Sequence, residues 1–121
     1  MKSCIEMTGG FYIMTDSFSN PVFKESFKKF FEVDDNGELK MGFLATTKVL
    51  TCPDFKVSGA IGQCAPVKVT GSPYVSSEQI GVGGTNTWYI GGIDQNKSLA
   101  VYFDITSTQT LTAQKKVHLQ F

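Results

Sequence analysis

The stretch LKMGFLATTKVLTCPDFKVSGAIG, residues 39–62, decides the fold because its side chains alternate between two registers. One register carries the odd-numbered residues from Leu39 to Val49, and the other carries the even-numbered residues between them. A period of two is typical of β-strands. Pro53 interrupts the run, since proline fixes φ and lacks a ladder donor, and a second strand starts at Phe55. The stretch therefore predicts a β-hairpin, and its small centre at Ser58-Gly59-Ala60 predicts the close approach of another element.

The composition is that of one ordered domain. The chain has 121 residues, of which 41% are hydrophobic and 18% charged, and this balance argues against intrinsic disorder. Eleven lysines stand against eleven acidic residues, and the sequence contains no arginine. Because nucleic acid is normally held through clustered phosphate contacts, this neutral balance predicts no nucleic-acid partner.

The cysteines predict neither a metal site nor a disulfide framework. Cys4, Cys52 and Cys64 form no CxxC pair, and the single histidine, His118, lies far from them in sequence. A structural zinc site needs about four closely spaced thiolate or imidazole ligands, so we expect no metal here. Free thiols favour the reducing cytosol. No apolar run approaches the ~20 residues of a membrane-spanning helix, and the N-terminus lacks a signal-peptide core.

The N-terminal part predicts a helix, a strand and a second helix. Residues 2–7 predict the end of a helix that Gly9-Gly10 stops, and the apolar run 11–14 predicts a strand buried on both faces. Asn20-Pro21 is typical of a helix start, with asparagine as the cap and proline in the first turn. A strand and a helix of this kind predict the remnant of an α/β domain.

Four phenylalanines lie at positions i, i+4, i+7 and i+8 of the second predicted helix and form one apolar stripe: Phe23, Phe27, Phe30 and Phe31. Such a stripe could serve a partner groove or a membrane surface. The preceding strand favours packing against a core instead. Asp34-Asp35-Asn36-Gly37 is typical of a turn and predicts a domain boundary.

Further strands are predicted after residue 62. The glycine-rich segment 80–84 leads into a strand-like run rather than a helix, so a turn or a β-bulge explains its glycines better than a phosphate-binding loop. Residues 99–105 and 117–121 predict two more strands. The predicted fold class is mainly β, an antiparallel β-sandwich. Alternation in the run after residue 86 predicts Trp88 and Ile90 inward, and Thr87 and Tyr89 outward.

Residues that could carry catalysis are few. His118 lies between Val117 and Leu119 and is predicted to face solvent. Asp16 and Ser17 follow the predicted strand at 11–14, where catalytic residues often collect, but no histidine lies near them in sequence. We therefore expect no catalytic, cofactor-binding or metal-binding residue and no enzyme.

Several spaced motifs in one order resemble the GTPase-activating subunit of the COPII inner coat, the Sec23 family. Three motifs resemble the end of its trunk domain: Thr8-Gly9-Gly10, Met14-Thr15-Asp16-Ser17-Phe18, and Phe23-Lys24 with Phe27. Later motifs resemble its β-sandwich domain: Lys40-Met41-Gly42-Phe43, Ser58-Gly59-Ala60-Ile61-Gly62 with Cys64, Ile80-Gly81-Val82-Gly83-Gly84-Thr85, Trp88, and Leu99-Ala100-Val101-Tyr102-Phe103. The resemblance covers nearly the whole chain and is weakest at residues 67–74 and 107–116. The sister subunit, which selects cargo, matches these motifs less well.

The resemblance implies two domains and a structural role. Residues 1–36 would be the C-terminal strand and helix of a von Willebrand A-like trunk domain, and residues 37–121 a β-sandwich domain that is incomplete at its C-terminal end. The implied function is scaffolding in the COPII vesicle coat during ER-to-Golgi protein transport, in the cytoplasm and peripheral on ER membrane and COPII vesicles. Implied partners are the cargo-binding inner-coat subunit, the coat's Arf-like small GTPase, the outer-coat cage protein and the ER membrane surface. The family activates its GTPase with an arginine, and this chain has none. The family's structural zinc site also lies in a domain outside these residues, so no cofactor is expected.

Asp16, Ser17 and Phe18, at the corner between predicted strand and helix, are the residues we expect to bind a coat partner. The alternative is that Phe18 only packs within the fold. Two other classes of protein stay open at this point. An extracellular-type β-sandwich binding module predicts a glycan at Asn96 and oxidised cysteines, and a small β-barrel enzyme or lipid carrier needs an interior pocket. Four aromatic residues are predicted to fill the interior and argue against such a pocket: Phe43, Phe55, Trp88 and Phe103.

Overall fold

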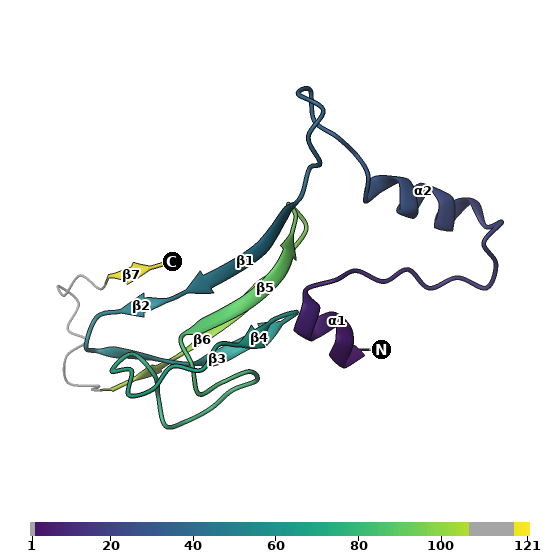
Figure 1. Cartoon of the computed structure of the whole chain (residues 1–121). Helices are drawn as coiled ribbons and strands as arrows, with labels where there is room; N and C mark the ends of the chain where they lie inside the picture. Colours follow the sequence, from purple (N-terminus) through teal and green to yellow (C-terminus); the bar gives the residue numbers. More distant parts are fainter. Residues whose placement is uncertain (1, 107–117) are drawn as a thin grey trace.

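The computed structural model describes residues 2–106 and 118–121. Two helices, α1 (Lys2–Thr8) and α2 (Pro21–Lys29), precede the strands, and α2 stands away from them at the end of two long loops (Figure 1). The fold is mainly β with antiparallel pairing, as the sequence predicts. The strands, which together form the β body, are β1 (Gly42–Lys48), β2 (Leu50–Thr51), β3 (Phe55–Gly62), β4 (Ala65–Pro66), β5 (Thr87–Ile93), β6 (Leu99–Ile105) and β7 (Leu119–Gln120).

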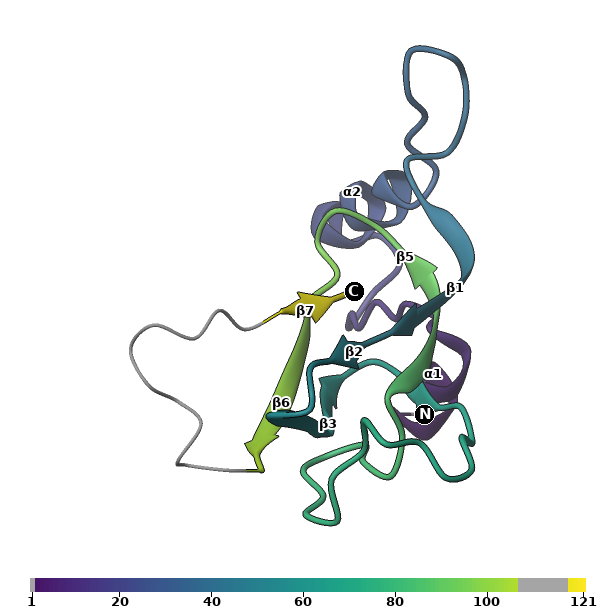
Figure 2. The ribbon, with the colours of Figure 1, turned by 90° about the vertical axis from the view of Figure 1, so that its left-hand side faces the viewer.

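The described strands pair in three antiparallel groups. β1, β5 and β4 form one sheet in that order, β3 pairs with β6, and β2 pairs with β7. Seen from the side, β3 and β6 lie together on one side of the β body, with β1 and β5 on the other (Figure 2). These two layers are the arrangement of a β-sandwich.

The predicted hairpin at residues 39–62 is wrong, although both of its strands exist. β1 pairs with β5 and β3 pairs with β6, so the two halves of the stretch belong to different sheets. The Phe55 N–H donates to the Cys52 carbonyl at 3.1 Å and closes the turn that carries the chain between them. Alternation sets the two faces of a strand, whereas its pairing partner here comes from a distant part of the sequence.

The core of the β body joins the two layers. Trp88, on β5, is fully buried, and its Nε1–H donates to the Val82 carbonyl at 2.9 Å. Trp88 and Ile90 point inward as predicted, and Thr87 and Tyr89 are half-buried. The buried cluster consists of Val49, Val57, Ala60, Cys64 and Trp88, with Val82, Leu99, Val101 and Phe103 packed against it.

Small residues at the centre of β3 let the loop before β5 lie directly on the strand. The Val82 N–H donates to the Ala60 carbonyl at 2.8 Å, and the Ala60 N–H donates back to Val82 at 3.2 Å. Gly59 has a φ of +152°, and a Cβ atom there would collide with the Ile80 carbonyl oxygen. The glycines of residues 80–84 therefore form a turn against β3, as predicted.

The N-terminal segment follows the prediction at its helices but not at its strand. α1 ends just before Gly9, whose φ is +64°, and α2 is capped by Asn20, whose Oδ1 accepts from the Val22 N–H at 2.9 Å. The predicted strand at 11–14 is wrong, because this run is irregular and the side chains of Tyr12 and Met14 are exposed. An apolar run becomes a strand only beside a pairing partner, and no described strand lies along it.

Candidate interaction surface

The corner before α2 is held by local hydrogen bonds while its side chains face outward. The Asn20 N–H donates to the Ser17 carbonyl at 3.0 Å, and the Thr15 hydroxyl donates to the same carbonyl at 2.9 Å. Asp16, Ser17 and Phe18, the predicted partner-binding residues, are all exposed, Phe18 by 78%. The corner is thus a shaped, outward-facing turn, and whether a partner binds it stays a prediction.

The phenylalanine stripe forms a continuous row of rings on the surface. Phe18 meets Phe23 edge-on with ring centres 5.3 Å apart, Phe23 stacks on Phe27 at 5.9 Å, and Phe27 meets Phe31 at 5.2 Å. None of the α2 residues is buried, and Phe27 remains 50% exposed. The prediction that this stripe packs into a core is wrong, because no described sheet lies beneath α2.

The row of rings opens into an apolar groove that continues to the start of β1. Its cavity volume is about 430 Å³. Phe43, predicted to fill the interior of the sandwich, is 64% exposed and lines this groove instead. The sequence contained one signal for this groove, because the odd-numbered register of residues 39–43 places three apolar side chains on one side of the chain. The lining residues are Phe11, Ile13, Phe23, Phe27, Phe30, Phe31, Leu39, Met41 and Phe43.

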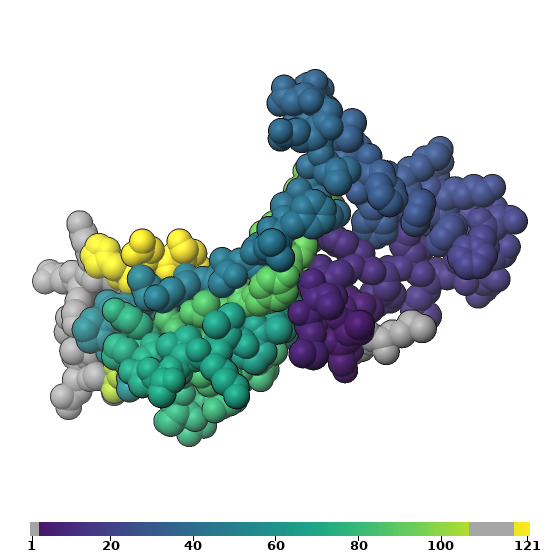
Figure 3. Space-filling model, in the orientation of Figure 1, coloured from purple at the N-terminus to yellow at the C-terminus, as the bar shows by residue number. Residues whose placement is uncertain are grey.

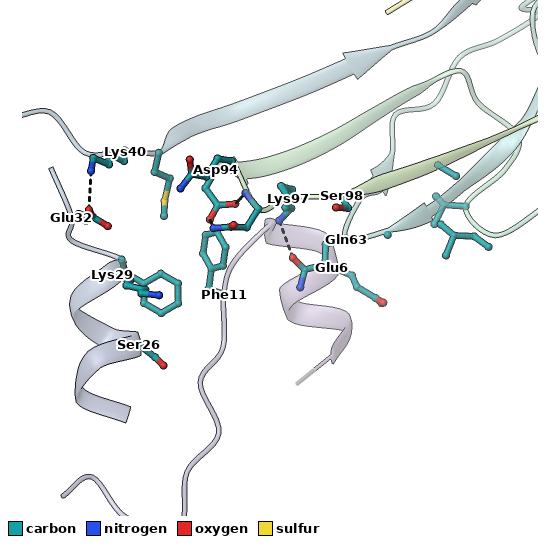
Figure 4. Close-up of a pocket in the computed structure, with 18 of the residues that line it drawn as sticks. Glu6, Phe11, Ser26, Lys29, Glu32, Lys40, Gln63, Asp94, Lys97 and Ser98 are labelled. Carbon is teal, nitrogen blue, oxygen red and sulfur yellow. Dashed lines mark hydrogen bonds and ion pairs between the residues drawn. The ribbon is translucent and has the colours of Figure 1, made fainter. Parts of the chain in front are cut away.

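The segment between α1 and β1, residues 11–41, is here called the phenylalanine arm, and it meets the β body through Phe11 and Lys97. The Lys97 Nζ lies 5.2 Å from the centre of the Phe11 ring, which in turn lies 5.0 Å from Phe30. The same Nζ donates to Gln63 Oε1 at 2.8 Å (Figure 4). A cavity of about 940 Å³ separates arm and body around this contact. In the space-filling view the arm forms a lobe of its own beside the β body (Figure 3).

Two ion pairs lie on the surface of the phenylalanine arm. The Lys40 Nζ lies 2.8 Å from Glu32 Oε1, and this hydrogen bond and charge lower the pKa of the Glu32 carboxyl below its ordinary value. Lys28 pairs with Glu25 at 3.3 Å on the exposed side of α2. Both pairs lie on the surface, where an ion pair adds little stability.

The described residues contain no cluster of side chains that could hold a metal ion. No three His, Cys, Asp or Glu side chains within residues 2–106 and 118–121 group closely enough to hold a metal ion. His118 is exposed, as predicted, and precedes β7, which lies at the opposite end of the molecule from α2 (Figure 1). The described part of the chain also contains no helix with the length and apolarity needed to span a bilayer.

The three thiols differ in their surroundings. Cys4 is exposed on α1, Cys52 is half-buried, and Cys64 is buried in the core. All three are unbonded to one another. Burial raises the pKa of the Cys64 thiol, and the nearby Glu6 carboxylate adds to this rise.

Among the described residues, two packed layers of antiparallel strands place the chain in the β-sandwich class. Comparison with known families agrees with this class. Residues 42–121, most of the chain, match the model of the Sec23/Sec24 beta-sandwich domain. The chain therefore belongs to the Sec23/Sec24 family, whose members are components of the COPII vesicle coat.

Proposed function

We propose that this chain is a structural part of the GTPase-activating subunit of the COPII coat, the Sec23 side of the family, and acts in ER-to-Golgi protein transport. The family match over residues 42–121 is the observation that carries the proposal. The motifs quoted above favour the activating subunit over its cargo-binding sister. Residues 1–36 belong in this proposal to the trunk domain, and residues 37–121 to the β-sandwich domain.

The role proposed for the chain is to scaffold and to bind, without catalysis. A GTPase activator of this kind inserts an arginine beside the transferred phosphoryl group, where it offsets developing negative charge. The chain contains no arginine, so it lacks the side chain for this step. No metal or cofactor is part of the proposed role.

The proposed partners are those of the coat: the cargo-binding inner-coat subunit, the Arf-like small GTPase, the outer-coat cage protein and the ER membrane surface. The proposed location is the cytoplasm, at the ER membrane and on COPII vesicles. Asp16, Ser17 and Phe18 are the proposed contact with a coat partner. The exposure of Phe18 supports this choice, because large apolar side chains at protein surfaces often anchor interfaces.

A binding assay with purified coat proteins tests the proposal. The chain is expected to bind the cargo-binding inner-coat subunit in analytical ultracentrifugation and to leave the rate of GTP hydrolysis by the coat GTPase unchanged. Binding to the GTPase-activating subunit in place of the cargo-binding one would assign the chain to the sister subunit. Faster hydrolysis in the presence of the chain would overturn the non-catalytic role.

Two variants locate the contact. Phe18→Ala is expected to weaken partner binding about tenfold while the melting temperature stays within ~1 °C, since a central aromatic anchor contributes more than 1 kcal/mol. Phe31→Ala, which removes an exposed ring at the other end of the same row and outside the corner, is the matched control and should leave binding unchanged. Equal losses of binding and melting temperature for Phe18→Ala would show that this ring only packs.

A thiol count separates the coat proposal from an extracellular β-sandwich. Native protein that is denatured under non-reducing conditions should titrate three thiols, and mass spectrometry should show no glycan at Asn96. Before denaturation the exposed Cys4 should react first and Cys64 last, because burial raises the pKa of the Cys64 thiol. Fewer than three titratable thiols would favour the extracellular class.

A further inference from the structure

The two ends of the phenylalanine arm are held close together on β5. Before the arm, a Cβ atom at Gly9 would collide with the Ile90 carbonyl oxygen, so the backbone after α1 lies directly against β5. After the arm, Gly42 lies opposite Ile93 in the β1–β5 ladder. Two attachment points on one strand leave the arm free to rotate about the line that joins them, so a further contact is needed to fix its direction.

Lys97 is held firmly by the β body. Its backbone N–H donates to the Asp94 carbonyl at 3.2 Å, in the turn that joins β5 to β6. Because β5 and β6 belong to different sheets, this turn fixes the residue relative to both. The Lys97 Nζ donates to Gln63 Oε1, just after β3, at 2.8 Å, and to the Gly9 carbonyl, just after α1, at 3.5 Å. The ammonium group therefore has a defined position beside the start of the arm.

The Lys97 ammonium group reaches the arm through one aromatic ring (Figure 4). Its Nζ lies 5.2 Å from the centre of the Phe11 ring, within the distance at which a cation is attracted to the face of a ring. The Phe11 ring centre lies 5.0 Å from that of Phe30, the residue that caps the C-terminus of α2. Three side chains thus connect the body to the end of α2. The cavity of about 940 Å³ around this contact leaves room for α2 to move if the connection is broken.

We propose that Lys97 sets the direction of the phenylalanine arm, and that removal of its positive charge releases the arm to move as a lobe on the β body. Glycine lies at both ends of the arm, at positions 10 and 42, and the wide range of φ open to glycine suits a hinge. The consequence for binding rests on the proposed function. The corner at residues 16–18 lies on the arm, so Lys97 also sets the direction in which this corner faces a coat partner.

Nuclear magnetic resonance relaxation of the full chain tests the proposal. In the unmodified chain the α2 amides are expected to have order parameters of about 0.85, the value of a rigid backbone, as the β5 amides do. Lys97→Met keeps an unbranched side chain of similar length but removes the charge and the donors, so the α2 values should fall below about 0.6. The carbon chemical shifts of α2 should stay helical, because the arm moves without unfolding. Lys97→Arg, which retains a cation and its donors, should keep the α2 values of the unmodified chain.

A second variant removes the other half of the contact. Phe11→Leu keeps an apolar side chain but removes the ring, so it should release α2 as Lys97→Met does, and the double variant should lower the α2 order parameters no further. Lys68→Met, the same substitution at an exposed lysine of the β body, is the matched control and should leave α2 unchanged. Because these measurements need no partner, their result does not depend on the proposed function.

Several results would overturn the proposal. Low α2 order parameters in the unmodified chain would show that the arm is not held, and unchanged values in Lys97→Met would show that the charge does not hold it. An equal fall in Lys97→Arg would show that the cation is not what matters, and loss of the helical shifts in Lys97→Met would show a role in folding α2 instead. The β5 amides report the state of the body throughout. If Lys97→Met unfolds the body, Phe11→Leu decides alone, because Phe11 lies outside the buried core cluster.

Discussion

The β body and the phenylalanine arm use the same kind of residue in opposite ways. Trp88 is fully buried between two layers of strands, whereas Phe27 is half-exposed in a row of rings that contact mainly one another. Both positions show the expected periodicity in the sequence, and both elements form. The difference is that strands from distant parts of the chain cover Trp88 and none of the described strands covers α2. Amphipathic periodicity thus specifies a face and says nothing about what covers it.

The largest effect that separates the two regions is expected from Trp88→Ala. Removing this buried ring leaves a cavity and deprives the Val82 carbonyl of its donor, so the free energy of unfolding should fall by about 3–5 kcal/mol. Urea unfolding followed by far-ultraviolet circular dichroism measures it. Phe27→Ala is the matched aromatic control in the arm. This variant should lower the free energy of unfolding by only ~1 kcal/mol, the scale of an exposed ring pair. Similar losses for both variants would remove the distinction between body and arm.

A smaller loss is expected from a buried amide that joins two strands. Asn86 is buried, its side-chain Nδ2 donates to the Val49 carbonyl at 2.8 Å, and its own carbonyl accepts from the Val49 N–H. Asn86→Ala leaves the Val49 carbonyl without that donor and should lower the free energy of unfolding by about 1–3 kcal/mol. Asn86→Asp keeps the size but offers no donor, so it should be at least as destabilising in the same urea titration. An unchanged midpoint for either variant would show that the Val49 carbonyl finds another donor.

The helix cap should affect the arm alone. Asn20→Ala removes the Oδ1 acceptor of the Val22 N–H, which typically costs about 1 kcal/mol of helix stability. Backbone amide shifts measured by nuclear magnetic resonance should show loss of helix at residues 21–29 while those of β5 stay in place. Asn20→Ser, which retains a capping oxygen, should preserve the helix. A change that spreads into β5 would show that arm and body unfold as one unit.

The sequence predicted the helices and strands themselves better than it predicted which elements lie beside them. The start of α2 at Asn20, the inward side of β5 at Trp88 and the turn at Gly81 all depend on local chemistry, and all were confirmed. The pairing of β1 with β5 could not be predicted, because the backbone N–H and C=O groups at the edge of a strand can bond to any neighbouring strand. The exposure of Phe43 was missed for a related reason, since the bulge that includes Leu44 changes the alternation and has no clear signal in this sequence.

The same limit applies to the candidate site. The exposed corner at Asp16, Ser17 and Phe18 could be singled out from its position before a helix start. For the groove beside it, the sequence offered only the apolar register of residues 39–43, because the groove forms only when the start of β1 returns next to α2. Leu39 and Met41 take part in the groove through tertiary folding, which their alternating run does not specify.

The smallest expected effect is a pH-dependent loosening of the turn where the arm returns to the β body. The Glu38 N–H donates to Asp34 Oδ1 at 2.9 Å, as does the Asn36 N–H, and these bonds lower the pKa of the Asp34 carboxyl below its ordinary value of 3.8. A lowered folded-state pKa means that the ionised form stabilises the turn above pH 3.8 and that this support is lost as the pH falls through the folded-state pKa. The amide resonances of Asn36 and Glu38 should therefore shift with a midpoint below pH 3.8, while those of β5 stay constant. Asp34→Asn, which cannot ionise, should abolish this titration, and a midpoint above 3.8 in the unmodified chain would contradict the hydrogen-bonded turn.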